Sequence, residues 1–250
     1  MAGSVDSAPD ARVFLTARWR DVVMLNYEVD GALLTGYSPR GCEVDSFGGR
    51  TLVSLVGFRF LRTRMFGAVR VPFHSNFLEV NLRFYVRRRD DSAGGVRRGV
   101  VFLREIVPRH AVAGIARFAY NENYCCCTMR HRLEENGAGM SAAYQWRAGG
   151  EWLGFEAQAR GAPALPVEGS IEQFVCEHYW GYSRQRDGGT VEYHVAHPPW
   201  RVRQSESAWF AGDAGTIYGA AFGEVLVRKP DSAFIAEGSE VTVFAGKRIA

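Results

Sequence analysis

Lysine is nearly missing from this chain of 250 residues. Of its 30 basic residues only Lys229 and Lys247 are lysine, which leaves 28 arginines, and the formal net charge is +3. This preference for arginine over lysine extends along the whole chain, which indicates a GC-rich genome rather than selected guanidinium sites. A nucleic-acid-binding protein would concentrate basic charge on one face, with stacking aromatic residues among it. Here the run Arg87–Arg89 is followed at once by Asp90 and Asp91, so nucleic acid is disfavoured as a partner.

Long apolar runs and a disulfide framework are absent as well. No apolar run reaches the roughly 18–20 residues that a membrane-spanning helix needs. Residues 1–11 lack the basic region and apolar core of a secretory signal, and we expect them to form a disordered tail. The five cysteines are an odd number without framework spacing, which predicts reduced thiols. We therefore expect a soluble, cytoplasmic protein with no membrane partner.

The composition is that of a folded chain, with 47% hydrophobic and 13% aromatic residues. There is no internal repeat, no low-complexity block and no linker long enough to divide domains. A single domain over residues 12–250 is therefore the prediction.

Short runs of β-forming residues, separated by glycine and proline turns, predict many strands and few helices. Helices are expected at 108–120 (with Pro108 in its first turn), at 170–177 (opened by the capping-box pattern Ser170–Gln173) and at 214–222. The predicted strands are 13–27 with a break near 19–21, a hairpin of 42–47 with 51–60, a pair 77–88 and 98–107, a meander from 124 to 160, a hairpin of 179–186 with 190–197, and single strands at 202–210, 224–227 and 241–244. The predicted class is α+β, mostly antiparallel β. Closing or half-closing such a sheet would remove its exposed edges and create an interior.

One stretch, Phe77–Val86 (FLEVNLRFYV), organises the functional hypothesis. Alternate residues of a strand point to opposite faces, so Val80, Leu82, Phe84 and Val86 share one face. The other face carries four hydrogen-bonding side chains, Glu79, Asn81, Arg83 and Tyr85. They form either an ordinary solvent-facing side of an antiparallel sheet or the polar lining of a ligand pocket.

The neighbouring stretch Gly99–His110 (GVVFLREIVPRH) favours the pocket, because it ends in further polar residues. Arg104 and Glu105 are adjacent and cannot share a strand face, and the register decides which of them joins the cluster. Arg109 and His110 fall in the first turn of the predicted helix, where an anion is favoured. Exposed side chains are the plainer interpretation of that last pair.

Three adjacent cysteines, Cys125, Cys126 and Cys127, are the most unusual local feature. On a strand, Cys125 and Cys127 share a face that Met129 and His131 continue, so a soft-metal site is conceivable. Buried thiols that pack as small apolar groups are the favoured interpretation, and no metal or other cofactor is predicted.

Four segments, FLTARWRDVVMLNYEV (14–29), LVSLVGFRF (52–60), FLEVNLRFYVRR (77–88) and GVVFLREIVPR (99–109), resemble the YqjF-like family, a bacterial domain of unknown function. The resemblance implies the fold of acetoacetate decarboxylase, a cone-shaped antiparallel barrel or half-barrel with a few short helices and a ligand cavity. In that enzyme an Arg-Glu pair on a strand precedes a proline and two lysines, one of which forms a Schiff base. Here Arg104 and Glu105 precede Pro108, Arg109 and His110, and neither of these last two side chains supplies a primary amine. Schiff-base decarboxylation is therefore not expected.

Two hypotheses follow. In the first, an internal polar cavity binds a small carboxylate-bearing or otherwise polar molecule, with Glu79 and Glu105 as acid and base. Arg83, Arg104 and Arg109 would hold the anion, with Asn81, Tyr85 and His110 beside it. In the second, the same polar face is a non-catalytic binding module that contacts a partner or another subunit. The sequence leaves open whether a reaction is catalysed and whether the chain forms a homo-oligomer.

Overall fold

The computed structural model describes residues 12–66, 69–70, 75–90, 95–109, 121, 123–137 and 139–250. Most of the predicted helix 108–120, including His110, lies outside these residues, as does the predicted tail.

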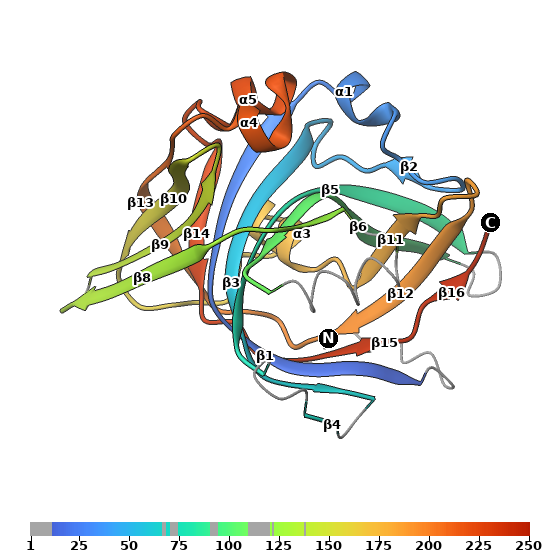
Figure 1. The fold of residues 1–250 in the computed structure, drawn as a ribbon, viewed down its shortest axis with the longest axis horizontal. Helices are drawn as coiled ribbons and strands as arrows, with labels where there is room; N and C mark the ends of the chain where they lie inside the picture. Colours follow the sequence, from blue (N-terminus) through green and yellow to red (C-terminus); the bar gives the residue numbers. More distant parts are fainter. Residues whose placement is uncertain are drawn as a thin grey trace.

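The elements keep the labels of Figure 1. The strands are β1 Val13–Val29, β2 Glu43–Val44, β3 Thr51–Met65, β4 Val69–Arg70, β5 Phe77–Asp90, β6 Gly95–Val107, β7 Tyr124–Cys126, β8 Met129–Asn136, β9 Gly139–Ala148, β10 Glu151–Arg160, β11 Trp180–Arg184, β12 Thr190–Ala196, β13 Val202–Ala211, β14 Ser232–Ala236, β15 Glu240–Phe244 and β16 Lys247–Arg248, and the helices are α1 Ala32–Thr35, α3 Ile171–Cys176, α4 Gly215–Tyr218 and α5 Ala220–Leu226.

Strand pairing runs around a cone and back to its start. The order is β3, β5, β6, β11, β12, β15, β1 and again β3. The joins β6–β11 and β12–β15 consist of two residue pairs each, so the barrel is not strictly closed. Among the described pairings, only those of β6 with β7 and β11 are parallel. The predicted mostly antiparallel α+β fold is confirmed.

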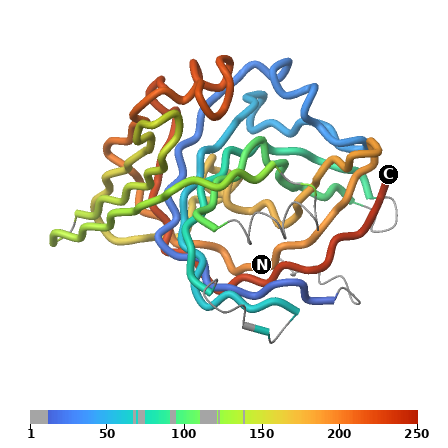
Figure 2. Tube along the Cα trace, in the orientation of Figure 1, coloured from blue at the N-terminus to red at the C-terminus, as the bar shows by residue number. Residues whose placement is uncertain are grey.

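A second layer continues from β1 through β14, β13, β10, β9 and β8. Figures 1 and 2 show it on the left of β1, with the cone on the right. The long strand β1 serves both layers, because its register against β3 shifts between Arg20 and Val23. Asp21 sits in this bulge at φ 56, and its backbone carbonyl accepts a 2.8 Å hydrogen bond from Tyr144 Oη of β9. The break expected near residues 19–21 is thus a bend within one strand.

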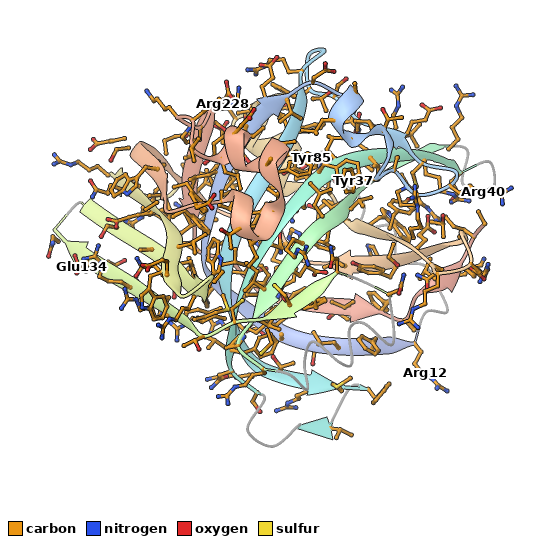
Figure 3. All side chains as sticks on the ribbon, turned by 45° about the horizontal axis from the view of Figure 1, so that its top comes forward. Arg12, Tyr37, Arg40, Tyr85, Glu134 and Arg228 are labelled. Atoms are coloured by element: carbon orange, nitrogen blue, oxygen red, sulfur yellow. The ribbon has the colours of Figure 1, made fainter. Side chains whose placement is uncertain are left out.

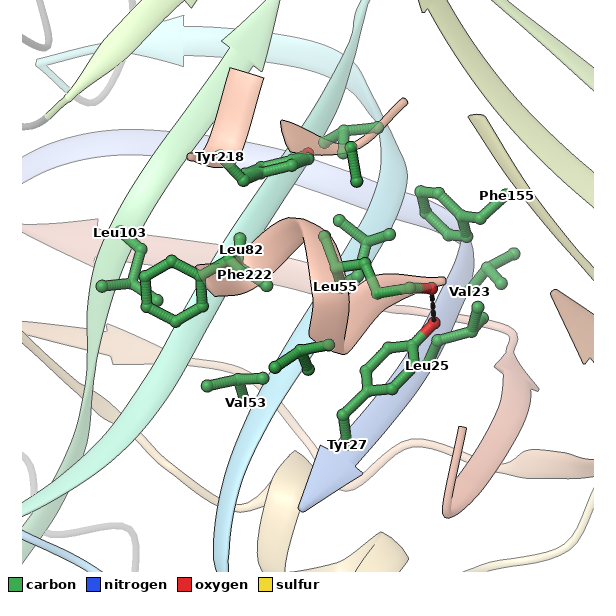
Figure 4. Packing of buried hydrophobic residues seen from close by; sticks show 14 of the residues in the cluster. Val23, Leu25, Tyr27, Val53, Leu55, Leu82, Leu103, Phe155, Tyr218 and Phe222 are labelled. Carbon is green, nitrogen blue, oxygen red and sulfur yellow. Dashed lines mark hydrogen bonds between the residues drawn. The ribbon is translucent and has the colours of Figure 1, made fainter. Parts of the chain in front are cut away.

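The core between the two layers, here called the outer core, is almost wholly hydrocarbon. It combines outward residues of β1, β3, β5 and β6 with residues of β9, β10, α4 and α5. Figure 4 shows part of this packing, in which Tyr27 Oη donates a 3.3 Å hydrogen bond to the carbonyl of Leu226. The layers approach closely at Gly57, where a Cβ atom would lie 2.6 Å from the Tyr144 ring. The barrel interior holds a second core of its own, which includes Phe174, Val175 and Cys176 of α3.

Several predicted elements need correction. The segment at 42–47 was expected to pair with 51–60, but β2 pairs with β5. The stretch 224–227, predicted as a strand, lies largely in α5, since Phe222, Val225 and Leu226 have helical spacing. Gly219, at φ 81, divides the helix expected at 214–222. The antiparallel pair β5–β6, the meander β8–β9–β10 and the hairpin β11–β12 are confirmed.

Candidate functional site

The polar face of β5 points into the barrel. Glu79, Asn81, Arg83 and Tyr85 are all buried, with Arg83 the most exposed at 9%. Tyr85 belongs to the interior core, whereas the alternate residues Val80, Leu82 and Phe84 belong to the outer core. Figure 3 shows Tyr85 in the midst of the strands, while Arg12, Arg40 and Glu134 lie at the periphery. The strand is therefore buried on both sides, with opposite chemistry on its two faces.

Register brings Glu105 of β6 to the same face. Asn81 pairs with Glu105, and Leu82 with Arg104, before a bulge between Leu82 and Arg83. Glu105 is 1% exposed and Glu79 is 4% exposed. Asn81 Nδ2 donates a 3.2 Å hydrogen bond to Glu79 Oε1. We call Glu79, Asn81, Arg83 and Glu105 the inner cluster.

Tyr124 contributes to the inner cluster from β7. The parallel pairing of β6 with β7 sets Tyr124 beside Glu105, and its hydroxyl donates a long, 3.4 Å hydrogen bond to Glu79 Oε2. Glu79 and Glu105 lie on diagonal positions of the paired strands β5 and β6, where the Cβ atoms are typically within about 8 Å of each other.

Arg83 ties β5 to the short helix inside the barrel. Its Nη2 donates a 3.0 Å hydrogen bond to the carbonyl of Val175 in the last turn of α3, where a cation complements the helix dipole. The guanidinium carbon lies 5.8 Å from the centroid of the Tyr85 ring. Among the described residues, neither Arg83 Nε nor Asn81 Oδ1, both buried, has a hydrogen-bond partner. Such atoms are rare in native proteins, because leaving them unpaired is costly.

Tyr85 ends a chain of hydrogen bonds that the sequence did not reveal. Ser54 Oγ donates to Asn26 Oδ1 at 2.6 Å, and Asn26 Nδ2 donates to Ser232 Oγ at 2.9 Å. The single proton of Ser54 is thereby used, so the 2.6 Å contact between Ser54 Oγ and Tyr85 Oη has the tyrosine as donor. Burial raises the pKa of Tyr85, although the charge of Arg83 opposes this. Tyr85 is thus neutral, and its hydroxyl proton is used in the hydrogen bond to Ser54. In the sequence, the sign of this hydrogen-bond chain is that Asn26 and Ser54 are polar residues within apolar strand segments.

A second buried polar pair, whose approach the sequence did not predict, is His178 with Asp45. His178 Nδ1 lies 2.6 Å from the carbonyl of Phe174, and its ring centroid is 4.7 Å from that of Tyr85. Its Nε2 is 3.8 Å from Asp45 Oδ2, which is too long for a hydrogen bond. Burial lowers the pKa of His178 in spite of this carboxylate. Burial raises the pKa of Asp45, but His178 and the Arg98 guanidinium, at 3.2 Å, more than offset it and lower the pKa overall.

Two of the predicted ligand-binding residues lie away from the inner cluster. Arg104 is on the opposite face of β6 from Glu105, and its Nη1 donates a 2.9 Å hydrogen bond to Asn123 Oδ1. Arg109 is exposed and lines a surface pocket of about 600 Å³ with Arg59, Arg130 and His131. Both lysines of the chain, Lys229 and Lys247, are exposed.

The alternative of a soft-metal site is not supported. Across the part of the chain that the structure describes, no three His, Cys, Asp or Glu side chains are grouped to hold a metal ion. Cys125, Cys126 and Cys127 are all described and half-buried, and no disulfide joins them to another described cysteine. Within the same described residues, no helix is both long and apolar enough to cross a membrane.

The fold is that of the acetoacetate decarboxylase-like proteins. The structure matches acetoacetate decarboxylase from Legionella pneumophila with a TM-score of 0.66 and 14% sequence identity, over 98% of this chain and 93% of that one. It matches the enduracididine biosynthesis enzyme MppR, in a complex with pyruvate, with a TM-score of 0.68 and 12% identity, over 98% and 93% of the two chains. The implied fold is thus confirmed.

The sequence defines the family more narrowly. The model of DUF2071, a family described as "Uncharacterized conserved protein", matches residues 16–240, and the chain belongs to this family. It is also 26% identical over 204 residues to the uncharacterized protein YqjF of Bacillus subtilis (strain 168), which covers 80% of each chain. The predicted YqjF-like relationship is confirmed.

Proposed function

We propose that the barrel interior binds a small carboxylate-bearing or otherwise polar organic molecule at the inner cluster. The observation that carries the proposal is the pair of buried atoms Asn81 Oδ1 and Arg83 Nε, which lack a hydrogen-bond partner in the described part of the chain, beside two buried carboxyl groups. An acceptor and a charged donor at one place provide both polarities of hydrogen bond to a ligand. A guanidinium away from bulk water also binds a carboxylate strongly.

The two carboxyl groups supply the means of proton transfer. In this proposal Glu79 and Glu105 act as the general acid and the general base of the site. The reaction class that fits is proton transfer next to a polarised carboxylate or carbonyl group. Imine formation does not fit, because both lysines are exposed at the periphery of the fold.

The acetoacetate decarboxylase-like fold supports this proposal, because MppR of the same fold has been obtained in complex with pyruvate. The alternative of an interaction surface has weaker support. A partner protein would need the polar face of β5 to be accessible, and each of its four side chains is at most 9% exposed.

The test is native mass spectrometry of the freshly purified protein, followed by titration with pyruvate, acetate and benzoate. We expect a bound small molecule, either co-purified or from this set, that is lost in Arg83→Met. Arg89→Met is the matched control, since Arg89 lies on the same strand but is exposed, and it should bind as the wild type does. The same adduct in Arg83→Met, or a wild type that carries no co-purified molecule and binds none of the three carboxylates, would overturn the carboxylate assignment.

A further inference from the structure

The strand β8 lies at the outer edge of the second layer (Figure 1). Its one neighbour among the described strands is β9, and the opposite side of β8 is here called the free edge. From Arg130 to Asn136 every residue except the half-buried His131 is exposed. An exposed strand edge presents backbone N–H and C=O groups to which another strand can be added.

The charges of β8 are divided into two blocks of opposite sign. The segment Arg130–Arg132 is basic and the segment Glu134–Glu135 is acidic, with Leu133 between them. Charged side chains usually protect an edge strand, because like charges repel a second copy of the same edge. Here two copies in antiparallel orientation would instead set each block opposite the block of the other sign, which is a favourable arrangement. The free edge is thus complementary in charge to itself.

The pairing of β8 with β9 decides which residues direct their backbone groups at the free edge. Hydrogen-bonded and non-hydrogen-bonded residue pairs alternate in an antiparallel ladder. Arg147 N donates a 2.9 Å hydrogen bond to the carbonyl of Thr128, and this pair continues the register of β8 with β9. The even-numbered residues of β8 therefore direct their N–H and C=O groups at β9, and His131, Leu133 and Glu135 direct theirs at the free edge.

We propose that a second copy of this chain pairs with the free edge, antiparallel and about a two-fold axis through Leu133. Two residues that lie opposite each other must both direct their backbone groups at the free edge or both direct them away from it, and a register centred on Leu133 satisfies this rule. It sets Arg132 of each copy opposite Glu134 of the other. His131 likewise lies opposite Glu135, and the second layers of the two copies form one continuous sheet.

The neighbouring registers are disfavoured by charge or by the backbone. A two-fold axis through Arg132 sets the two Arg132 side chains opposite each other, and an axis through Glu134 does the same with the two Glu134 side chains. Like charges directly opposite each other destabilise a strand pair. An axis between two residues is excluded, because a residue that faces the free edge would then lie opposite one that faces β9.

The surface pocket beside β8 provides an independent observation. Its lining of about 600 Å³ includes the basic side chains of Arg59, Arg109, Arg130 and His131. Residues that lie opposite each other on paired strands project from the same face of the sheet. Glu135 is exposed, and in the proposed register Glu135 of the second copy lies opposite His131. The pairing therefore brings an exposed carboxylate to a group of positive charges.

The experiment measures the mass of the full-length protein in solution by sedimentation equilibrium over a range of concentrations. We expect a monomer–dimer equilibrium for the wild type. Arg132→Glu and Glu134→Arg each set like charges opposite each other twice in the dimer, so each should raise the dimer dissociation constant about tenfold or more. An equimolar mixture of these two variants should form dimers again, because the charges of the two chains match.

Arg147→Glu is the matched control. It makes the same change of charge as Arg132→Glu at an exposed residue of β9, which is not an edge strand, and it should dimerise as the wild type does. Circular dichroism should show that each variant is folded.

A crosslink between introduced cysteines tests the register. The two Leu133 Cα atoms would lie about 5.5 Å apart in a hydrogen-bonded pair, which is within the range that a disulfide bridges. Leu133→Cys should therefore give a dimer linked through the introduced cysteines on mild oxidation, detected by non-reducing electrophoresis and peptide mapping. In Glu135→Cys the introduced cysteines are four residues out of register, about 13 Å apart along the strand, and should not be linked to each other.

Four results would each overturn the proposal. They are a wild type that is monomeric at every concentration, a dimer that both charge reversals leave unchanged, a mixture of the two variants that stays monomeric, and a folded Leu133→Cys variant that forms no such crosslink.

Discussion

The two faces of β5 are both buried but differ in nearly every other respect. The outer face packs Val80, Leu82 and Phe84 into hydrocarbon between the two layers. The inner face carries Glu79, Asn81 and Arg83 among the aromatic and aliphatic residues of the barrel interior. Apolar burial stabilises the fold by about 25 cal/mol per Å², whereas burial of polar groups costs free energy unless each is hydrogen-bonded.

This difference indicates that the two faces of β5 have different roles. The outer face would supply stability, and the inner face would keep polar groups that the fold does not need. Residues that break the local rules of folding without an evident structural gain are expected at functional sites. Substitutions on the two faces should therefore have unequal effects on the free energy of unfolding.

The largest effect is expected for Leu82→Asn on the outer face. Leu82 is fully buried, so the substitution removes hydrocarbon and leaves an amide without partners. We expect a loss of about 3–5 kcal/mol in the free energy of unfolding, measured by urea denaturation followed by circular dichroism. A loss under about 1 kcal/mol would show that the outer core is not what stabilises this strand.

A smaller loss is expected where the two layers touch. In Gly57→Ala the new methyl group would meet the Tyr144 and Phe155 rings at 2.6 and 2.8 Å, and such overpacking costs about 1–3 kcal/mol. Gly36→Ala is the control, because a methyl group there has nothing within 4 Å. Thermal denaturation should show a lower Tm for the first variant alone, and equal Tm values would contradict the close contact.

Acid should weaken the barrel interior through His197, which stacks on Trp200 with ring centroids 4.5 Å apart. Burial lowers the pKa of His197 to about 4, and the charges of Arg83 and His194 act in the same direction against the Pro198 carbonyl. The folded state therefore binds this proton less readily than the unfolded chain, whose histidine pKa is about 6.5. The stability contribution is full above pH 6.5 and is lost as the pH falls through 4.

The variant His197→Gln tests whether His197 causes this pH dependence of stability. We expect the decrease in unfolding free energy between pH 7 and pH 4 to be about 1–3 kcal/mol smaller in His197→Gln than in the wild type. His178, whose pKa is also lowered by burial, keeps part of the dependence in both proteins. Identical pH profiles would show that His197 is protonated as easily in the folded state as in the unfolded chain.

Local patterns predicted much of this fold. Alternation in Phe77–Val86 predicted two unlike faces on β5, and the Ser170–Gln173 pattern predicted the start of α3, where Ser170 Oγ accepts a 3.2 Å hydrogen bond from Gln173 N. The choice between Arg104 and Glu105 could not be predicted, because it depends on the register of β6 and on a bulge in its pairing with β5.

Long-range contacts explain what the sequence did not predict. The partner of β2 is a strand more than 40 residues away, to which no local turn signal points. The chain from Tyr85 through Ser54 and Asn26 to Ser232 joins four separate strands. The sequence could mark such residues only as polar positions within apolar strands.

The most direct test of the central claim is the unfolding free energy of Asn81→Leu, compared with that of Leu82→Asn one residue away. If the inner cluster serves a ligand rather than the fold, replacing Asn81 should change stability by no more than about 1 kcal/mol, because the gain of apolar burial and the removal of Oδ1 offset the lost hydrogen bond to Glu79. A loss of about 3 kcal/mol or more would mean that these polar groups hold the barrel together, and the binding proposal would lose its physical basis.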